Sequence, residues 1–201
     1  MIYITSDTHF WHMNRYGGII AYCNRPYGSI VEMNEGIIKN WNEIVQPTDT
    51  VYHLGDFAFC GTTKLKEILL QLNGMITLIK GNHDYEKKEK YLSFGFTDVL
   101  PYEKIDQFFL THYPIYRPED LEKDLGKREL ADSEHTRHCY QKVTDAFKES
   151  CCSIVLHGHT HDKMYHRDDL LHVNISVDAN NYRPVSLDDI RKRFTFVEKG
   201  I

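Results

Sequence analysis

Aspartate, asparagine and histidine side chains follow directly after five short apolar runs in this chain of 201 residues. A hydrophobic core needs no such row of polar groups, so these positions are candidates for chemistry. Carboxylate, amide oxygen and imidazole together make a set of hard to borderline metal ligands. No cysteine lies in the set, so a thiolate zinc site is not expected. The candidate ligands are Asp7, His9, Asp56, Asn82, His112, His159 and His161.

Seven candidate ligands are too many for one ion, and they suit two ions that share one carboxylate. In such centres the ions lie roughly 3.5–4 Å apart, clamp a phosphate and lower the pKa of a trapped water from 15.7 toward roughly 7. The expected reaction class is therefore metal-assisted hydrolysis, with phosphate esters as the best match.

The apolar runs that precede these residues are predicted to be buried strands, because they are short and bounded by polar or turn residues. In open α/β sheets, ligands bind outside the carboxyl ends of the strands, which is where the polar residues fall. Glycines at 55, 81 and 158 would let the backbone come close to a compact centre. The predicted strands are Met1–Ser6, Thr50–Leu54, Met75–Ile79, Gln107–Leu110, Ser153–Leu156 and Leu170–Val177.

Apolar residues recur at helical spacing between some of these runs. Ser29 and Glu32 have the spacing of a capping box before the first predicted helix. Ser186 could cap the last predicted helix, which extends through Phe194. The alternation of strands and helices predicts an α/β protein with a mixed sheet. The predicted helices before this last one are Val31–Val45, Thr63–Leu72 and His135–Lys148.

Residues 114–138 break this rhythm, with two prolines at the start and a dense run of charge after them. One interpretation is a solvated surface excursion. The other is a loop or lid beside the active site, because the segment directly follows His112.

The composition indicates an ordinary globular protein that forms one domain over residues 1–201, with 41% hydrophobic and 26% charged residues. No apolar run is long enough for a membrane span, and the N-terminus lacks the pattern of a signal peptide. Five cysteines without a CxxC pair fit a reducing cytoplasm. The net charge of −5 disfavours a broad nucleic-acid-binding face.

The ordered motifs resemble those of the calcineurin-like metallophosphoesterase superfamily. They are Asp7-x-His9, Gly55-Asp56, Gly81-Asn82-His83-Asp84, a lone His112 and Gly158-His159-x-His161. The resemblance implies a four-layer αββα sandwich, in which two mixed β-sheets pack face to face and helices lie outside.

The same resemblance implies a role for each residue. Asp7, His9 and His161 would hold a first metal, whereas Asn82, His112 and His159 would hold a second. Asp56 would bridge both ions. His83 would contact the scissile phosphate and protonate the leaving group, and Asp84 would orient His83.

A narrower resemblance to small bacterial and phage members of the superfamily extends over nearly the whole chain. The chain departs from the protein-phosphatase branch, because Phe57 follows Asp56 and Asp84 follows His83, so a protein phosphatase is not expected. The motifs that carry the narrower resemblance include Tyr22-Cys23-Asn24-Arg25-Pro26, Asn40-Trp41-Asn42 and Val177-Asp178-Ala179-Asn180-Asn181-Tyr182-Arg183-Pro184.

Several further residues have two open interpretations. His53 is either a hydrogen-bonded support of the ligands or a plain buried histidine, and Arg25 either contacts phosphate or forms a surface ion pair. His157 is not expected to bind metal. His12 and Asn14 are candidates for the pocket wall, and Asn174 and Asp178 for support of the ligands.

The sequence thus predicts a dinuclear metal-dependent phosphohydrolase, with a phosphodiesterase on a small or nucleotide-derived diester as the first hypothesis. The alternatives are a phosphomonoesterase and an inactive phosphate-binding protein on the same fold; a DNA nuclease is disfavoured. The expected cofactor is two divalent ions, with Mn²⁺ first and Fe, Zn²⁺ or Ni²⁺ as alternatives. The expected partner is a small phosphoester, without long nucleic acid or membrane, in the cytoplasm. The oligomeric state stays open.

Overall fold

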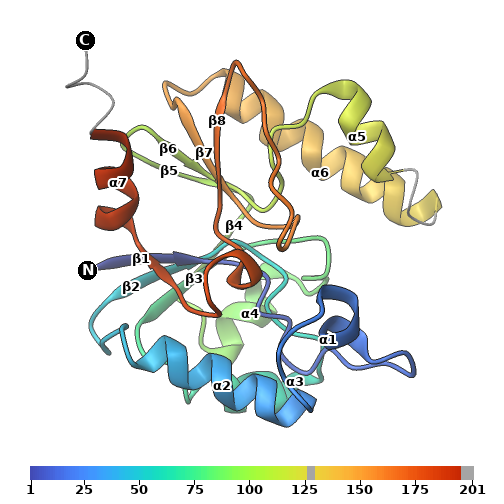
Figure 1. Cartoon of the computed structure of the whole chain (residues 1–201), viewed down its shortest axis with the longest axis vertical. Coiled ribbons are helices and arrows are strands. Elements are labelled where there is room, and N and C mark those ends of the chain that lie inside the picture. Colours follow the sequence, from blue (N-terminus) through green and yellow to red (C-terminus); the bar gives the residue numbers. More distant parts are fainter. Residues whose placement is uncertain (126–129, 196–201) are drawn as a thin grey trace.

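Two mixed β-sheets lie face to face in the computed structural model, which describes residues 1–125 and 130–195 (Figure 1). The first sheet has the order β4-β3-β2-β1-β9 and the second the order β5-β6-β7-β8. Strands β1 to β4 run parallel and β9 antiparallel, while β6, β7 and β8 run parallel and β5 antiparallel. The strands are β1 (Ile2–Thr5), β2 (Thr50–His53), β3 (Met75–Ile79), β4 (Asp98–Leu100), β5 (Glu103–Ile105), β6 (Phe108–Leu110), β7 (Ile154–His157), β8 (Leu171–Asn174) and β9 (Val185–Ser186).

Helices cover the outer faces of both sheets, which gives the four expected layers (Figure 1). Helices α2, α3 and α4 pack on the first sheet, and α6 packs on the second. The helices are α1 (Gly18–Cys23), α2 (Ile30–Asn42), α3 (Thr62–Leu69), α4 (Lys88–Phe94), α5 (Pro118–Leu125), α6 (Leu130–Lys148) and α7 (Leu187–Thr195), with a 3₁₀ turn η1 (Val177–Ala179).

The central strands β6 and β7 of the second sheet are buried on both faces, because their apolar residues alternate between the two. Phe108 and Leu110 of β6 face the first sheet, where they meet residues such as Ile4. Phe109, the residue between them, packs with Val143 of α6 on the other face. Successive side chains of a strand point to opposite faces of the sheet, so one short strand contributes to two hydrophobic cores.

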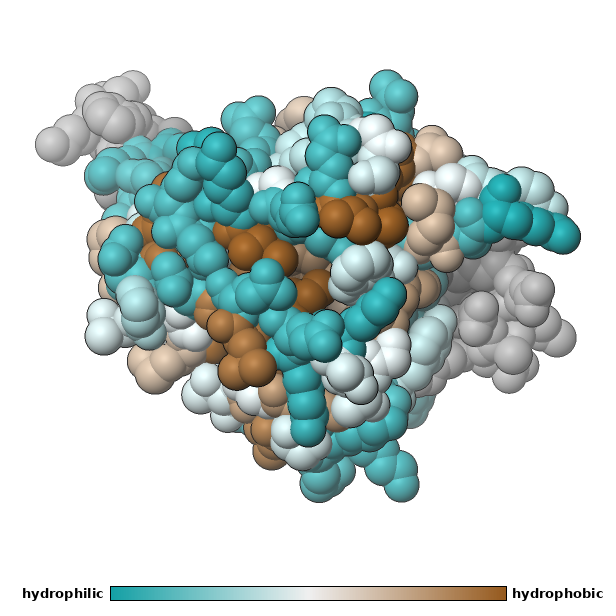
Figure 2. All heavy atoms as spheres, turned by 90° about the horizontal axis from the view of Figure 1, so that it is seen from below, coloured by the Kyte–Doolittle hydropathy of each residue, from teal (hydrophilic) through white to brown (hydrophobic). Residues whose placement is uncertain are grey.

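The outer helical surface is polar. Figure 2 shows the molecule from below, where hydrophilic residues cover most of the face and hydrophobic residues gather in small patches between them. In the part of the chain that the structure describes, no helix is long and apolar enough to cross a membrane.

The predicted fold class is confirmed, and each predicted strand and helix has a counterpart. The Ser29 cap is confirmed, since its side chain accepts a hydrogen bond from the Glu32 amide at 3.1 Å. The Glu32 carboxylate accepts one from Gly28 at 2.8 Å, one residue before the cap. The expected run Leu170–Val177 is divided, because β8 ends at Asn174 and η1 follows.

The described part of residues 114–138 is built into the fold. It contains α5 and the start of α6, and its Tyr116 and Leu121 pack with Tyr140 of α6 in a small core. The part of this segment over residues 126–129 lies outside the described residues. The interpretation as a loop beside the active site is taken up below.

A leucine pair tests the packing between the sheets. Leu156 of β7 is fully buried there, whereas Leu70 after α3 is 87% exposed. We expect Leu156→Ala to lower the free energy of unfolding by about 2–5 kcal/mol, because it removes apolar contacts and leaves a cavity. Leu70→Ala, the matched control, should change it by no more than about 0.5 kcal/mol. Equal effects in urea unfolding would contradict the assigned core.

Candidate metal centre

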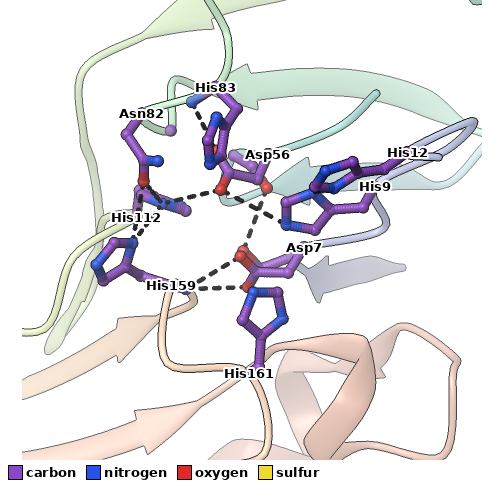
Figure 3. Close-up of polar contacts among 12 residues, drawn as sticks. Asp7, His9, His12, Asp56, Asn82, His83, His112, His159 and His161 are labelled. Atoms are coloured by element: carbon purple, nitrogen blue, oxygen red, sulfur yellow. Dashed lines mark hydrogen bonds and ion pairs between the residues drawn. The ribbon is translucent and has the colours of Figure 1, made fainter. Parts of the chain in front are cut away.

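The polar residues predicted from the strand ends meet at one place in the structure (Figure 3). Strands β1, β2 and β3 run parallel in the first sheet, and β6 and β7 run parallel in the second. Their carboxyl ends therefore open on the same region, where the loops after them carry the candidate ligands. The amide of His159 donates to both carboxylate oxygens of Asp7, at 3.2 and 3.0 Å, so this contact joins the two sheets.

Left-handed backbone conformations aim many of these side chains. The φ angles are 58° at Asp7, 49° at His9, 57° at Asp56, 69° at His159 and 54° at His161. Residues other than glycine rarely adopt this region, and such conformations concentrate at functional sites. The loops also hold one another, since the amide of Asp7 donates to the Gly55 carbonyl and that of His9 to the Asp56 carbonyl, both at 3.0 Å.

Glycine is required where these loops touch. A Cβ at Gly158 would lie 1.9 Å from the Ser6 Oγ, and one at Gly55 would lie 2.4 Å from the Gly81 amide nitrogen. Gly55 also has a φ of 92°, which side chains disfavour. The expected role of the glycines in close backbone approach is confirmed.

Two groups of ligand atoms are close enough to hold an ion each. Asp7, His9 and His161 form one group, and Asp7, Asp56 and His112 form another, with all ligand atoms of a group within 4.8 Å of one another.

Asn82 joins the second group. Its Oδ1 lies 3.0 Å from the His112 Nε2 and 3.0 Å from the His159 Nδ1. All seven predicted ligands are thus brought together, although their binding of metal stays a prediction.

Asp7 is the carboxylate that both groups contain, and Asp56 of the second group also approaches the first. The Oδ2 of Asp56 is 3.6 Å from the His9 Nε2 and 3.6 Å from the His112 Nε2. Its Oδ1 accepts a hydrogen bond from the His83 amide at 2.9 Å. One carboxylate oxygen therefore faces an imidazole of each group, which is the placement that a bridging ligand needs.

The electrostatics of the cluster favour cations. Burial raises the pKa of Asp7, and burial together with the charges of Asp84 and Asp7 raises the pKa of Asp56 well above its usual range. Burial and neighbouring positive groups lower the pKa values of His9 and His112 well below the ordinary value. Such a cluster keeps carboxylates charged and imidazoles neutral when cations lie among them.

The His9 Nε2 atom is buried without a hydrogen-bond partner among the described residues. Buried nitrogens without a partner are costly, and a metal ion would satisfy this one. The residues present therefore fit divalent metal ions with mixed nitrogen and oxygen ligation.

A buried ion pair between Arg25 and Asp178 supports the first ligand group. The Arg25 guanidinium donates to Asp178 at 2.8 and 2.7 Å, and to the carbonyls of Asp7 and Thr8 at 2.7 and 2.9 Å. The surface ion pair considered for Arg25 is wrong, because the side chain is buried and is held by the chain itself.

Asp178 in turn lies 2.8 Å from the Nδ1 of His161. Burial lowers the pKa of His161, but hydrogen bonds to Asp178 and Cys23 and the charge of Asp7 outweigh it and raise the pKa to about 11. Carboxylate partners of this kind orient ligand histidines. The supporting role expected of Asp178 has this contact in its favour.

Asp84 holds backbone amides. Its Oδ2 accepts from the amides of Asp56 and Gly81, both at 2.8 Å, and its Oδ1 accepts from the amide of Phe57 at 3.2 Å. These bonds join the loop after β2 to the loop after β3. The orientation of the His83 ring by Asp84 stays a prediction.

His83 lies at the open side of the cluster. Its Nδ1 is 3.2 Å from the Tyr85 hydroxyl, and its ring centre is 4.6 Å from that of Phe59 and 5.9 Å from that of His9 (Figure 3). It is therefore near the ligands without belonging to either group.

His12, a candidate for the pocket wall, contacts His9 instead and does not line the cavity beside the centre. The Nδ1 atoms of the two rings lie 3.1 Å apart, and the His12 ring stacks on Phe59 at 3.8 Å. The contact leaves the Nε2 of His9 directed at Asp56. The other pocket candidate, Asn14, accepts hydrogen bonds from the amides of Tyr16 and Gly18 and so shapes the turn before α1.

The remaining histidines next to the motifs are buried. His53 Nε2 lies 3.0 Å from the hydroxyl of Thr8, a neighbour of two ligands, so it supports the first loop. His157 belongs to neither of the two ligand groups among the described residues, and its exclusion from metal binding stays a prediction.

Sequence reasoning missed two residues of this region. Phe59 carries no charge or ligand atom, so no motif pointed to it. Cys23 forms a close group with His161 and Asp178, and its only signal was its place next to Arg25 in a quoted motif.

A family model and an archaeal protein match most of this chain. The model of the calcineurin-like phosphoesterase superfamily domain matches residues 1–175. An uncharacterized protein of Methanocaldococcus jannaschii is 36% identical over 206 residues, which cover 99% of this chain and 92% of that protein.

Two solved structures are also similar to the chain. A protein of unknown function from Aquifex aeolicus has a TM-score of 0.66 and 30% identity, and the match covers 96% of this chain and 99% of that one. The phosphopantetheinyl hydrolase of Mycobacterium tuberculosis has a TM-score of 0.46 and 10% identity, over 93% and 96% of the two chains. The resemblance read from the motifs is confirmed, and the chain belongs to the calcineurin-like phosphoesterase superfamily.

Proposed function

We propose that the protein is a dinuclear metal-dependent phosphodiesterase that acts on a small or nucleotide-derived phosphodiester. The observation that carries this proposal is the position of Asp56, whose Oδ2 lies at 3.6 Å from an imidazole nitrogen of each ligand group. Asp7, His9 and His161 would hold one ion with Asp56, and Asn82, His112 and His159 would hold the other. Mn²⁺ suits these ligands, as do Fe, Zn²⁺ and Ni²⁺.

Two divalent ions bound there would supply positive charge to the phosphate and lower the pKa of an attacking water. The protein's own residues hold the geometry. Asp84 fixes the loops that carry Asp56 and Asn82 through backbone amides, and Arg25 holds the Asp7 carbonyl. His83, at the open side, donates a proton to the departing oxygen.

The placement of cations favours a diester over a monoester. A monoester carries one more negative charge and benefits from additional arginine or lysine near the phosphate. Arg25 is held by Asp178, and the Lys80 ammonium donates to the Glu86 carbonyl at 3.0 Å. Arg117 lies 3.8 Å from Asp168. Arg25, Lys80 and Arg117, the basic residues near the motifs, thus already have hydrogen-bond or ion-pair partners within the chain.

We also propose that the protein works in the cytoplasm. The cysteines among the described residues are free, which suits the reducing conditions there. The mixed nitrogen and oxygen ligands suit the metals named above.

The first prediction concerns the proposed bridge. Asp56→Asn keeps the size of the side chain but removes its charge. We expect it to bind less metal, to lose most of the rise in melting temperature that Mn²⁺ gives the wild type, and to turn over at least about 100-fold more slowly. Metal analysis and thermal scans with and without Mn²⁺ test this. Asp168→Asn, at a side chain 88% exposed, is the matched control. Two ions and full activity in Asp56→Asn would refute the bridge.

The second prediction concerns His83 as the general acid. His83→Asn should slow hydrolysis of alkyl or ribose esters by roughly 10²–10⁴, because a poor leaving group needs a proton. Nitrophenyl esters should lose less, and the metal content should not change. His166→Asn, at an exposed histidine, controls for loss of an imidazole. Equal losses on both ester types would leave His83 with phosphate positioning alone.

The third prediction concerns ester type. With Mn²⁺, kcat/KM for bis(p-nitrophenyl) phosphate should exceed that for p-nitrophenyl phosphate by about tenfold, a transition-state preference of roughly 1.4 kcal/mol. The two compounds share a leaving group and differ in charge on the phosphate. A preference for the monoester would instead support the phosphomonoesterase alternative.

A further inference from the structure

A cavity of about 290 Å³ opens directly beside the candidate metal centre. Its inner wall includes His159 and His161, so a group bound in it would touch the proposed ligands. Its other walls come from the end of α1, from Tyr116 together with α5, and from residues 160–165. None of these wall segments belongs to the strands that build the centre.

Aromatic and thioether side chains form the walls. Tyr22 is 75% exposed, and its ring centre lies 5.9 Å from that of His161. Met164 at the mouth is 90% exposed. The rings of Tyr116 and Tyr165 pack against each other at 4.9 Å. Large apolar groups exposed at the edge of a polar centre indicate a binding surface for an apolar or aromatic group.

Hydrogen bonds hold the Tyr165 ring and the backbone of Tyr116 behind the cavity. The Tyr165 hydroxyl accepts from the Arg117 amide at 2.8 Å and donates to Asp120 at 3.2 Å. The Tyr140 hydroxyl donates to the Tyr116 carbonyl at 2.6 Å. This wall is therefore preorganised, which reduces the entropy cost of binding.

The charges around the cavity balance. Lys123 and Lys163 supply two cations, and Asp120 and Asp162 supply two carboxylates. Lys123 lies 3.3 Å from Asp120. A second phosphate or another highly charged group would meet as many anions as cations here. An uncharged group that combines an aromatic face with hydrogen-bonding edges suits the walls better.

The volume of the cavity also favours a small group. Pockets for small molecules begin near roughly 300 Å³, so this cavity of about 290 Å³ takes a single small group rather than a stretch of polymer. We propose that the cavity lined by Tyr22, Met164 and Tyr165 is a nucleoside subsite, which receives the base and sugar of a nucleotide diester while its phosphate lies at the metal centre. This inference rests on the proposed phosphodiesterase function and names its substrate class.

Two diesters with the same leaving group test the subsite. Thymidine 5′-(p-nitrophenyl phosphate) carries a nucleoside, and methyl p-nitrophenyl phosphate carries a methyl group in its place. For the wild type with Mn²⁺ we expect a higher kcat/KM for the thymidine ester. Tyr22→Ala should lower the ratio of the two kcat/KM values by roughly 10- to 100-fold, which is the range of a lost base–aromatic stack.

Two variants serve as controls. Tyr22→Phe keeps the ring and should keep the ratio. Tyr16→Ala removes another exposed aromatic ring of the same segment, one that does not line the cavity, and should also keep it. Equal kcat/KM values for both diesters in the wild type would overturn the subsite. So would an equal loss on both in Tyr22→Ala, which would assign the cavity to the nitrophenyl group.

A binding measurement separates this inference from the function beneath it. Thymidine alone has no phosphate, so its binding, followed by saturation-transfer NMR, does not depend on catalysis. We expect the wild type and Tyr22→Phe to bind thymidine and Tyr22→Ala to lose the signal. If neither diester is hydrolysed but thymidine binds in this pattern, the phosphodiesterase proposal fails and the subsite stands. If the diesters are hydrolysed and thymidine binding does not depend on Tyr22, the function stands and the subsite fails.

Discussion

The burial of Asp7 and Asp56 among four imidazoles is the constraint on which the rest of the structure depends. Burial raises the pKa of both carboxyl groups, so their charged forms need compensation from cations or from hydrogen-bond donors. The protein also holds both residues in left-handed backbone conformations, which cost free energy of their own. A site of this kind persists only where the surrounding loops are held rigidly from several directions.

Those loops are held by two carboxylates that do not belong to the ligand set. Asp84 accepts from the amides of three residues and so locks the loops after β2 and β3 together within the first sheet. Asp178, from the segment after β8, joins His161 of the second sheet to Arg25, which in turn holds the carbonyls after β1. The centre is thus braced once within a sheet and once across the two sheets.

The strand ends could be predicted from the sequence because each ligand follows a short apolar run, and parallel strands bring such ends together. Contacts between segments that are distant in the sequence could not be predicted in this way. Arg25 and Asp178 are 153 positions apart, and nothing in the local pattern of either indicates a buried ion pair. Short elements were missed for a related reason: β9 has two residues and β5 has three, too few to show a period, and they form because an edge strand offers them a partner.

In the function proposed here, the chemistry and the choice of substrate reside in different parts of the chain. The ligands lie at the ends of paired strands, where a shift of one residue would turn every side chain away and disrupt both cores, so their positions are tied to the fold. The walls of the neighbouring cavity come from α1, from Tyr116 and α5, and from the loop after β7, which lie outside the two sheets. Such segments tolerate changes in length and sequence better than strands do. A scaffold built in this way can keep one phosphate-cleaving centre while its neighbouring walls change, and this separates what the superfamily shares from what this chain selects.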